Sequence, residues 1–388
     1  MASSHPASDP PIANQTRYST LSSRQPDRFE FSSITALDEL EGIRTDWLVL
    51  TGGKPAIFQS FGWNRNWYEA YSDTFDAIQI FVLKRNGQVV ALLPCYRKGN
   101  RIRLAGDTLC DFQDLIALTS EDAEQFIIEL FSHARKKNFH FHFHQLSDRG
   151  NLWPLIKRYA TNTGFDYYEK VLGPCPWFEL SEDGESFLVA AKAKLRKRIR
   201  RALRRLEDLA PGHEYRLLGH SQITASTIAD IAALHERNQH RKEGKSIFAN
   251  ETYRNFILNA AREPDTGIHI VEVRAATGEL IAFDLGFHSD SRFYAYIGSY
   301  DAPFSGGSPG VCLLHWQMDR LPLMGIREYD FLCGSEAYKF DYAENTYKIM
   351  SVKVYTRGFM NSLRLIAYRN ARKLKVALKP LLMRVGLL

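Results

Sequence analysis

The sequence of 388 residues predicts a mixed α/β (α+β) fold of two similar lobes with mixed sheets. The length is comfortable for two domains. Two hairpins stand far apart, one turning at Asn86-Gly87 and one at 276–279. Around each hairpin the patterns run in the same order: helices, hairpin, strand, helix and strand. A strongly basic amphipathic helix separates these halves, so we expect it to link the lobes.

The first half gives period-2 and period-3.6 patterns in alternation. Trp63 and Trp67 fall on one helical face, which is typical of core packing. The expected elements are a strand at 29–34, helices at 37–48 and 58–68, hairpin strands at 77–83 and 89–95, strands at 102–104 and 114–118, a helix at 123–136, a strand at 139–144, a helix at 152–163 and a strand at 165–171.

The segment 139–144 alternates Phe and His strictly, so His140, His142 and His144 share one face of a strand. Imidazoles two residues apart can share a metal ion. A half-buried strand with Phe packed inward gives the same pattern, and no Asp, Glu or Cys nearby is placed as a fourth ligand. We therefore expect a structural strand and no metal site.

The segment 185–209 predicts one amphipathic helix with a leucine-rich apolar stripe. From 186 to 206 it carries nine cations and no acid: Lys192, Lys194, Arg196, Lys197, Arg198, Arg200, Arg201, Arg204 and Arg205. Such a face attracts phosphates on coenzyme A, nucleotide sugars, lipids or nucleic acid, although a solvated helix face is also compatible with it.

The second half contains the most informative stretch, 292–342. A strand at 293–300 leads through the glycine-rich loop 305–310 into a helix at 311–321, which Pro322 should end early. Free N–H groups in the first helical turn make such a loop an anion site, although an ordinary tight connection looks the same. The other expected elements are a strand at 213–219, a helix at 228–239, hairpin strands at 268–274 and 280–288, and a strand at 329–332.

Composition restricts the function further. Five scattered cysteines without a CxxC pair indicate reduced thiols and a cytoplasmic protein. Residues 1–28 lack an apolar segment, so we expect a disordered lead-in rather than a secretory signal. Residues 358–388 have cations and no acid on a helical pattern, which fits peripheral membrane contact and equally a helix packed on the protein. The intervening residues divide into lobes at 29–180 and 181–357.

The stretch 292–342 resembles the C-terminal part of CelD/BcsL-type acetyltransferases. The resemblance lies in the order of its parts: the tyrosine-rich strand, the Ser308-Pro309-Gly310 loop, the helix, the run 329–332, Gly334 and the run 336–339. Those proteins have the GNAT fold and are associated with cellulose and other exopolysaccharide clusters. The likeness extends from about residue 58 to residue 353. They are similar to the Fem-type peptidyltransferases, whose two halves are both GNAT-like, which implies two tandem GNAT-like lobes here.

The resemblance implies an acyltransferase that uses acetyl-CoA or another acyl-CoA as co-substrate, with no permanently bound cofactor. Asp284, Asp330 and His235 are candidate general bases, and Tyr338 is the candidate proton donor to the departing thiolate. Lys339 is expected to pair with donor phosphate or with Asp330. The expected donor-binding residues are Ile297, Gly298, Ser299, Ser305, Gly306, Gly307, Ser308, Gly310, Val311 and Lys339.

The expected acceptor is an amino or hydroxyl group of a sugar or small precursor, reached by direct transfer, because no nucleophilic constellation is evident. Two alternatives remain open. A Fem-like transferase would take its acyl group from charged tRNA, using the basic helix on the RNA backbone. A catalytically inactive GNAT-like scaffold would act at a membrane surface through the C-terminal segment.

Overall fold

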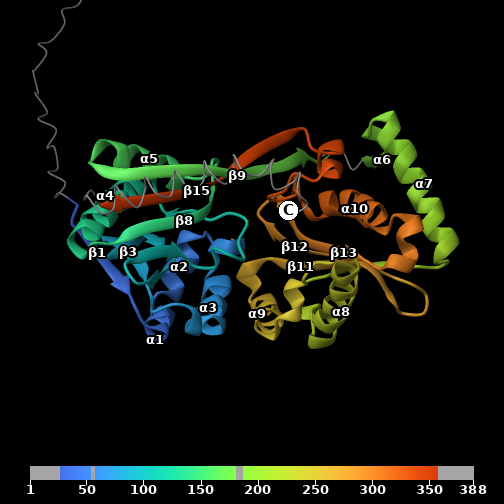
Figure 1. The fold of residues 1–388 in the computed structure, drawn as a ribbon, viewed down its shortest axis with the longest axis horizontal. Coiled ribbons are helices and arrows are strands. Elements are labelled where there is room, and N and C mark those ends of the chain that lie inside the picture. Colours follow the sequence, from blue (N-terminus) through green and yellow to red (C-terminus); the bar gives the residue numbers. More distant parts are fainter. Residues whose placement is uncertain (1–26, 54–56, 181–186, 357–388) are drawn as a thin grey trace, which may run out of the picture.

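The computed structural model describes residues 27–53, 57–180 and 187–356. The expected C-terminal helix at 358–388 and nearly all of the expected lead-in at 1–28 lie outside these ranges. Within them the chain forms a mixed α/β structure in which helices cover both sides of a long, mixed sheet (Figure 1). No helix in the described ranges combines the length and the apolar character needed to cross a membrane.

Most strands lie close to the positions that the period-2 patterns predict. Their bounds are β1 Phe29–Ile34, β2 Ala77–Ile78, β3 Ile80–Arg85, β4 Gln88–Leu93, β5 Cys95–Lys98, β6 Arg101–Leu104, β7 Ile116–Ala117, β8 His140–Ser147, β9 Phe165–Glu179, β10 Glu214–Leu218, β11 Ile268–Arg274, β12 Leu280–Ser289, β13 Arg292–Tyr300, β14 Glu328–Asp330 and β15 Asn345–Thr356. Strand β15 was not predicted.

The helices follow the period-3.6 patterns, except that helix α9 was not predicted. Their bounds are α1 Leu37–Glu41, α2 Arg44–Leu50, α3 Phe61–Ala70, α4 Ser120–Lys137, α5 Leu152–Asn162, α6 Phe187–Ala190, α7 Ala193–Leu209, α8 Ala225–Arg241, α9 Glu251–Ala261 and α10 Pro309–Arg320. The single helix expected at 37–48 is wrong, because the chain breaks at Gly42–Ile43 into α1 and α2. Helix α10 ends two residues before Pro322, as predicted.

One sheet runs through both lobes. Its strand order is β10-β11-β12-β13-β14-β9-β15-β8-β6-β5-β2. Strand β9 pairs with β14 of the C-terminal half at its end and with β15 from Phe165 to Trp177. Strand β15 also pairs with β8 of the N-terminal half (Figure 1). The lobes therefore share strands from distant parts of the sequence, and the division at residues 180 and 181 stays a prediction.

A second, four-stranded sheet in the N-terminal half has the order β1-β3-β4-β7. Its β3–β4 hairpin turns at Asn86 and Gly87, which both have positive φ, 53° and 85°. Two successive residues of that kind form the tight turn that Asn-Gly favours, so the predicted hairpin is confirmed.

An aromatic core joins the two halves. Trp63, on α3, is fully buried, and its ring centroid lies 4.7 Å from that of Phe256 on α9 and 5.5 Å from that of Phe287 on β12. Trp67 is 4% exposed in the same cluster. The predicted core role of both tryptophans is confirmed, and edge-to-face packing of this kind resists relative movement of the lobes.

The basic segment between the halves differs from its prediction. Instead of one helix over 185–209, the described part contains α6 and α7, with Lys192 in an extended conformation (ψ 143°) as the N-cap of α7. Helix α7 buries Leu195, Ile199 and Leu206 against α10 and its neighbours. Its cationic side faces away from the protein.

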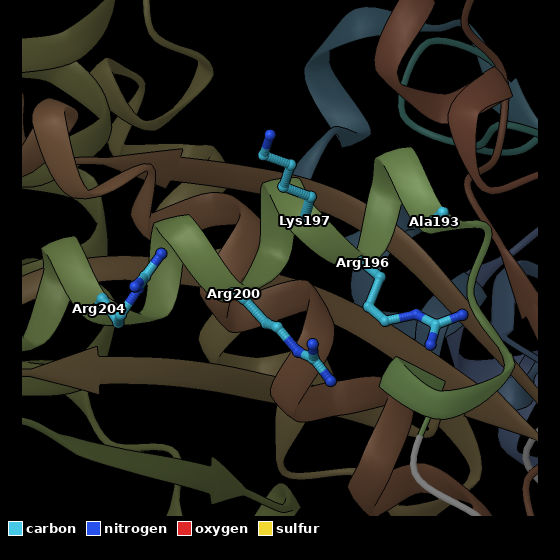
Figure 2. A pocket seen from close by; sticks show the side chains of 5 residues that line it. All are labelled: Ala193, Arg196, Lys197, Arg200 and Arg204. Atoms are coloured by element: carbon cyan, nitrogen blue, oxygen red, sulfur yellow. The ribbon is translucent and has the colours of Figure 1, made fainter.

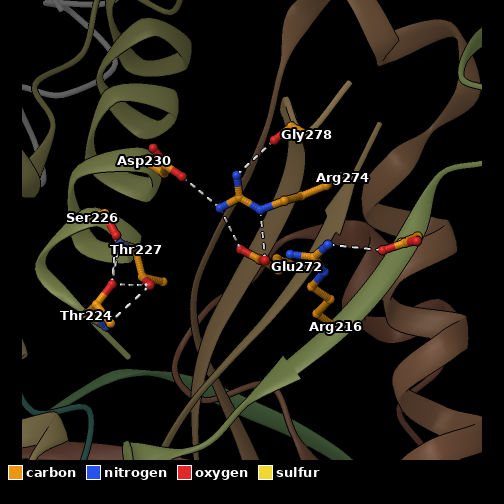
Figure 3. A network of polar contacts seen from close by, with 9 residues as sticks. Arg216, Thr224, Ser226, Thr227, Asp230, Glu272, Arg274 and Gly278 are labelled. Atoms are coloured by element: carbon orange, nitrogen blue, oxygen red, sulfur yellow. Dashed lines mark hydrogen bonds and ion pairs between the residues drawn. The ribbon is translucent and has the colours of Figure 1, made fainter. Parts of the chain in front are cut away.

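In the C-terminal half, α8 and α9 lie on one side of β11–β13 and α10 lies on the other (Figure 1). An ion-pair network attaches α8 to the sheet (Figure 3). There Arg274 on β11 pairs with Glu272 at 2.8 Å and with Asp230 of α8 at 2.7 Å. The sheet between these layers is thereby held in a fixed position relative to α8.

Candidate functional site

The candidate site is a gap between β13 and β14. These parallel strands pair only at Arg292–Tyr294, because β14 ends at Asp330 while β13 continues to Tyr300. In the described part of the chain, no strand pairs with the β14-side edge of β13 after Tyr294. A bulge in the β12–β13 ladder places Tyr296 as the extra residue. The backbone of Ile297, Gly298 and Ser299 thus follows a bulge beside an open edge.

Asp284 on β12 is the carboxyl group nearest this stretch of β13. It pairs across the ladder with Gly298, and a methyl group at Gly298 would touch its Oδ1 at 3.7 Å. The Gln317 side-chain amide donates to Asp284 Oδ2 at 3.0 Å, and the Tyr329 hydroxyl donates at 3.1 Å. Burial raises the pKa of Asp284 to about 6, against the opposing effect of these donors. A carboxyl with this pKa is ionised at neutral pH and accepts a proton readily.

Tyr338 lies in the short 3₁₀ helix η8 (Ala337–Asp341), next in the chain after β14 and Gly334. Its ring packs edge-on against Phe331 at 6.0 Å between centroids, and half of its surface is exposed. Burial of the rest, followed by the charge of Asp284, raises the pKa of Tyr338 to about 12. The tyrosine therefore keeps its proton at neutral pH, and the charge of Asp284 acts on it.

Lys339, adjacent to Tyr338, does not pair with Asp330. Its ammonium group donates to the carbonyl oxygens of Phe331 at 3.0 Å and Cys333 at 3.5 Å and forms an ion pair with Glu336 at 3.1 Å. It is 7% exposed. The predicted pairing with Asp330 is wrong, because Lys339 bridges the chain that follows β14 instead. A donor phosphate would have to compete with these protein oxygens.

The N-terminal lobe contributes a carboxyl group, Asp111, that no sequence pattern singled out. Asp111 lies on the loop between β6 and β7 and accepts a hydrogen bond from the Cys333 N–H. Burial raises its pKa to about 6, and Lys339 opposes the rise. A second contact joins this loop to β13. The Tyr296 hydroxyl donates to the Leu109 carbonyl oxygen at 2.6 Å. The loop thus borders the gap beside the bulge.

The glycine-rich loop forms the 3₁₀ helix η6 (Ala302–Gly307), and Ser308 caps α10 with φ 51°. Pro309 is the first residue of α10, as predicted. The N–H groups of Ser308 and Val311 donate to the carbonyls of Ser305 and Ser308 at 3.0 and 2.9 Å. Residues 305, 306, 308 and 310 are exposed. Gly310 lies in the first turn of α10, where the helix provides no acceptor for its backbone N–H group. This N–H group is at an exposed position and can bind an anion.

Two glycines of the loop have a packing role. A methyl group at Gly307 would lie 3.0 Å from the Leu206 Cα, and one at Gly306 would touch Leu209. These leucines belong to α7, so the glycines allow the loop to approach that helix closely. A methyl group at Gly310, by contrast, would meet no atom within 4 Å. Gly310 is therefore the glycine of this loop that leaves its surroundings open.

His235 lies on the opposite side of the sheet from Asp284. Its Nδ1 is 2.8 Å from the Ser246 hydroxyl, and its ring packs against Phe248. Burial lowers its pKa, so it is neutral at pH 7. On the same side of the sheet, Asn238 donates to the Ser299 hydroxyl at 2.9 Å. The structure does not bring His235 together with Asp284 or Tyr338.

Asp330 is fully buried and points away from Asp284, because successive residues of a strand face opposite sides and Tyr329 faces Asp284. Its Oδ1 accepts the N–H of Leu332 at 2.8 Å, and Leu332 has φ 54°. Burial raises the pKa of Asp330 to about 7, while the Leu332 N–H and Arg292 lower it. The geometry gives Asp330 a structural role in turning the chain after β14.

We expect Asp330→Asn to stabilise the protein at high pH relative to the wild type. The folded-state pKa of about 7 exceeds the unfolded value of about 3.9, so the folded state binds more protons between these values and the wild type loses stability as pH rises. Asn cannot lose a proton. Urea unfolding at pH 5 and pH 8 should show the variant gaining roughly 2–4 kcal/mol over the wild type between these values. If the variant and the wild type differed in free energy of unfolding by the same amount at pH 5 and pH 8, Asp330 would not be the ionising group.

The alternating strand β8 behaves as its pattern predicts. Phe141 and Phe143 are buried in the core, and the rings of His140 and His142 contact Tyr355. Burial, then Lys353 and two arginines, lowers the pKa of His142 to about 3. Positive surroundings of this kind disfavour a metal cation. In the described ranges, no cluster of three His, Cys, Asp or Glu side chains is placed to hold a metal ion.

Residues 193–340 match the family model described as an acetyltransferase (GNAT) domain. This match confirms the predicted fold class of mixed α/β lobes with the GNAT fold and supports an acyltransferase.

Solved structures of similar fold cover both lobes. A conserved protein of unknown function from Bacteroides thetaiotaomicron is 15% identical, with a TM-score of 0.55 over 84% of this chain and 100% of its own. FemX is 12% identical, with a TM-score of 0.55 over 84% and 97%. L-PGS from Bacillus licheniformis is 11% identical, with a TM-score of 0.52 over 85% and 95%. Among curated proteins there is no match.

Proposed function

We propose that this protein is an acyl-CoA-dependent N- or O-acyltransferase that acts by direct transfer on an amino or hydroxyl group of a sugar or small precursor. The observation that carries the proposal is the gap after Tyr294, where β13 has an open edge and Gly298 lies across the ladder from Asp284. The chain leaves this strand through η6 into the N-terminus of α10. The GNAT domain match at 193–340 supports it. Acetyl is the proposed acyl group.

The donor would bind along the loop and β13. Its pyrophosphate would lie on the exposed face formed by Ser305, Gly306, Ser308 and Gly310, where the helix N-terminus attracts anions. Its thioester would lie at the open edge of 297–299, where a backbone N–H polarises the carbonyl. Gly307 supports this arrangement indirectly by letting the loop pack on α7.

The proposed transfer needs two proton movements. The acceptor nitrogen or oxygen attacks the thioester carbon, its proton passes to Asp284, and the new C–N or C–O bond replaces the C–S bond. Tyr338 gives its proton to the departing thiolate and regains one from Asp284, which restores both groups. The raised pKa of Asp284 suits a base, and that of Tyr338 keeps the donor protonated.

The CelD/BcsL resemblance extends the proposal to a precursor in cellulose or other exopolysaccharide biosynthesis. It rests on the 292–342 stretch, where the strand, loop, helix and Gly334 stand in the order that the resemblance requires. FemX and L-PGS share the fold at low identity, so an aminoacyl donor carried by tRNA is the competing hypothesis for the same gap.

The test is isothermal titration of acetyl-CoA into the wild type and Gly310→Glu. The new side chain enters open space and favours the helix N-terminus, so the fold should be kept while the carboxylate repels the donor pyrophosphate. We expect wild-type binding and at least a tenfold loss in Gly310→Glu, with Gly310→Ala as the matched control that binds normally. Absence of wild-type binding to acetyl-CoA and to longer acyl-CoA would overturn the donor assignment and favour aminoacyl-tRNA or a scaffold role.

A further inference from the structure

The outer face of α7 carries more positive charge than the proposed reaction uses. From Lys192 to Arg205 it presents nine cations over roughly 20 Å of helix. Arg198 forms an ion pair with Asp341 and covers the Tyr342 ring. No other cation of this face forms an ion pair with a residue that the structure describes.

Like charges at helical spacing repel one another, so this face is costly without a partner. Arg196, Arg200 and Arg204 follow one another at successive turns, and Lys197 extends beside them (Figure 2). They border a hollow of about 350 Å³ whose lining is completed by Ala193. Among the residues that the structure describes, all of this lining comes from α7. A row of cations along one side of a helix suits an extended anionic surface.

Exposed apolar side chains accompany the cations near the N-terminal end of α7. Val189 on α6 is 54% exposed, and Phe340, which precedes the Arg198 partner Asp341, is 44% exposed. Leu323 is 70% exposed and follows α10, whose Asp319 accepts the N–H of Phe187 on α6. Cations mixed with exposed apolar side chains match the polar headgroups and acyl boundary of a bilayer. The backbone of a nucleic acid offers phosphates but no apolar surface.

We propose that the outer face of α7, with the apolar residues at its N-terminal end, docks this protein onto bilayers that contain anionic phospholipids. This inference does not depend on the proposed acyl transfer. It also differs from membrane contact through residues 358–388, because here the cations that bind the membrane are those of α7.

The test is sedimentation of the full chain with vesicles of phosphatidylcholine and phosphatidylglycerol at 7:3, and with pure phosphatidylcholine, in 0.1 M NaCl. We expect binding to the anionic vesicles only. The double variant Arg200→Glu/Arg204→Glu should bind at least about thirtyfold more weakly, because each basic residue lost removes a factor of about five and each new carboxylate is repelled by the anionic surface. It should fold normally, because the changes relieve repulsion on an exposed face.

The matched control is Lys136→Glu/Lys137→Glu, which changes net charge equally at exposed positions of α4. We expect its affinity to stay within about twofold of the wild type, since screening confines each charge to roughly 10 Å. Phe340→Ser should weaken vesicle binding several-fold without changing the salt dependence.

Three outcomes would overturn the proposal. Equal vesicle binding by the α7 variant and the wild type would move the contact elsewhere, with residues 357–388 as the first candidate. Equal losses of vesicle affinity in the α4 and α7 variants would show that net charge, and no specific surface, determines the binding. Tighter binding of a fluorescein-labelled 20-nucleotide RNA than of the vesicles, lost in the α7 variant, would identify nucleic acid as the partner.

Discussion

Asp284→Asn is expected to lower kcat/KM for acyl transfer by about 10²–10⁴-fold, the usual contribution of a positioned general base. Asn keeps the side-chain oxygen near Gln317 and Tyr329 but cannot accept a proton at neutral pH. The affinity for acetyl-CoA should change little, because Asp284 is proposed to act on the acceptor. The measurement is release of free coenzyme A thiol with an acceptor that the wild type uses, together with donor titration.

The pH profile distinguishes a base from a merely structural carboxyl. Because burial raises the pKa of Asp284 to about 6, the fraction of ionised base increases as pH rises through 6. Wild-type kcat/KM should therefore increase across this range. The residual activity of Asp284→Asn should lack that limb. If the residual activity of Asp284→Asn still rises with pH through 6, the rise belongs to another titrating group. Asp111 is the first candidate, because its pKa is also raised to about 6.

Asp330→Asn is the matched control for the Asp284 variant. It removes another buried carboxyl with a raised pKa, one that points away from Asp284 on the neighbouring strand β14. We expect kcat/KM within a few-fold of the wild type. If Asp330→Asn lost activity 100-fold while Asp284→Asn did not, the roles of the two carboxyl groups would be reversed.

Local patterns predicted most of the elements that form the candidate site. The Asn-Gly hairpin, the β13 strand, Pro309 at the start of α10 and the end of α10 before Pro322 all depend on residues within one turn or strand. The break at Lys192 was missed because the apolar stripe of 185–209 continues through it. Strand β15 was missed because its place in the sheet depends on pairing with β8 and β9, which are distant in sequence.

The candidate site shows the same limit. Asp284 was selected because it lies on the strand that precedes the expected gap. Its contacts with Gln317 and Tyr329 could not be predicted, because the three residues belong to three separate elements. Asp111 reaches the gap only because the lobes pack together. A glycine has no side chain, so either a ligand or another helix can approach its backbone closely. The sequence alone does not show that Gly307 makes room for α7 rather than for the donor. The pairing of Lys339 with Asp330, one of two alternatives, was wrong because the bonds of Lys339 to the Phe331 and Cys333 carbonyls depend on how the chain turns after β14.

A large loss of stability is expected from substitution of Gly286, where β12 meets the bulge of β13. Gly286 pairs with Ala295, next to the extra residue Tyr296. A methyl group there would lie 2.6 Å from the Tyr294 carbonyl oxygen and would overlap the buried ring of Phe293. The carbonyl belongs to the backbone, so the strands must separate to admit the methyl group. We expect Gly286→Ala to lower the free energy of unfolding by about 1–3 kcal/mol, as overpacking in a well-packed core does.

Urea unfolding of Gly286→Ala measures this loss, and acetyl-CoA titration below the unfolding midpoint measures its consequence for the gap. Tyr294 is also the last residue of β13 that pairs with β14, so moving it should disturb the point where the two strands diverge and weaken donor binding. Gly310→Ala is the control, because its methyl group meets no atom within 4 Å and Ala favours a helix over Gly. Unfolding of Gly286→Ala within 0.5 kcal/mol of the wild type, on the order of an ordinary surface change, would show that the bulge adjusts without strain.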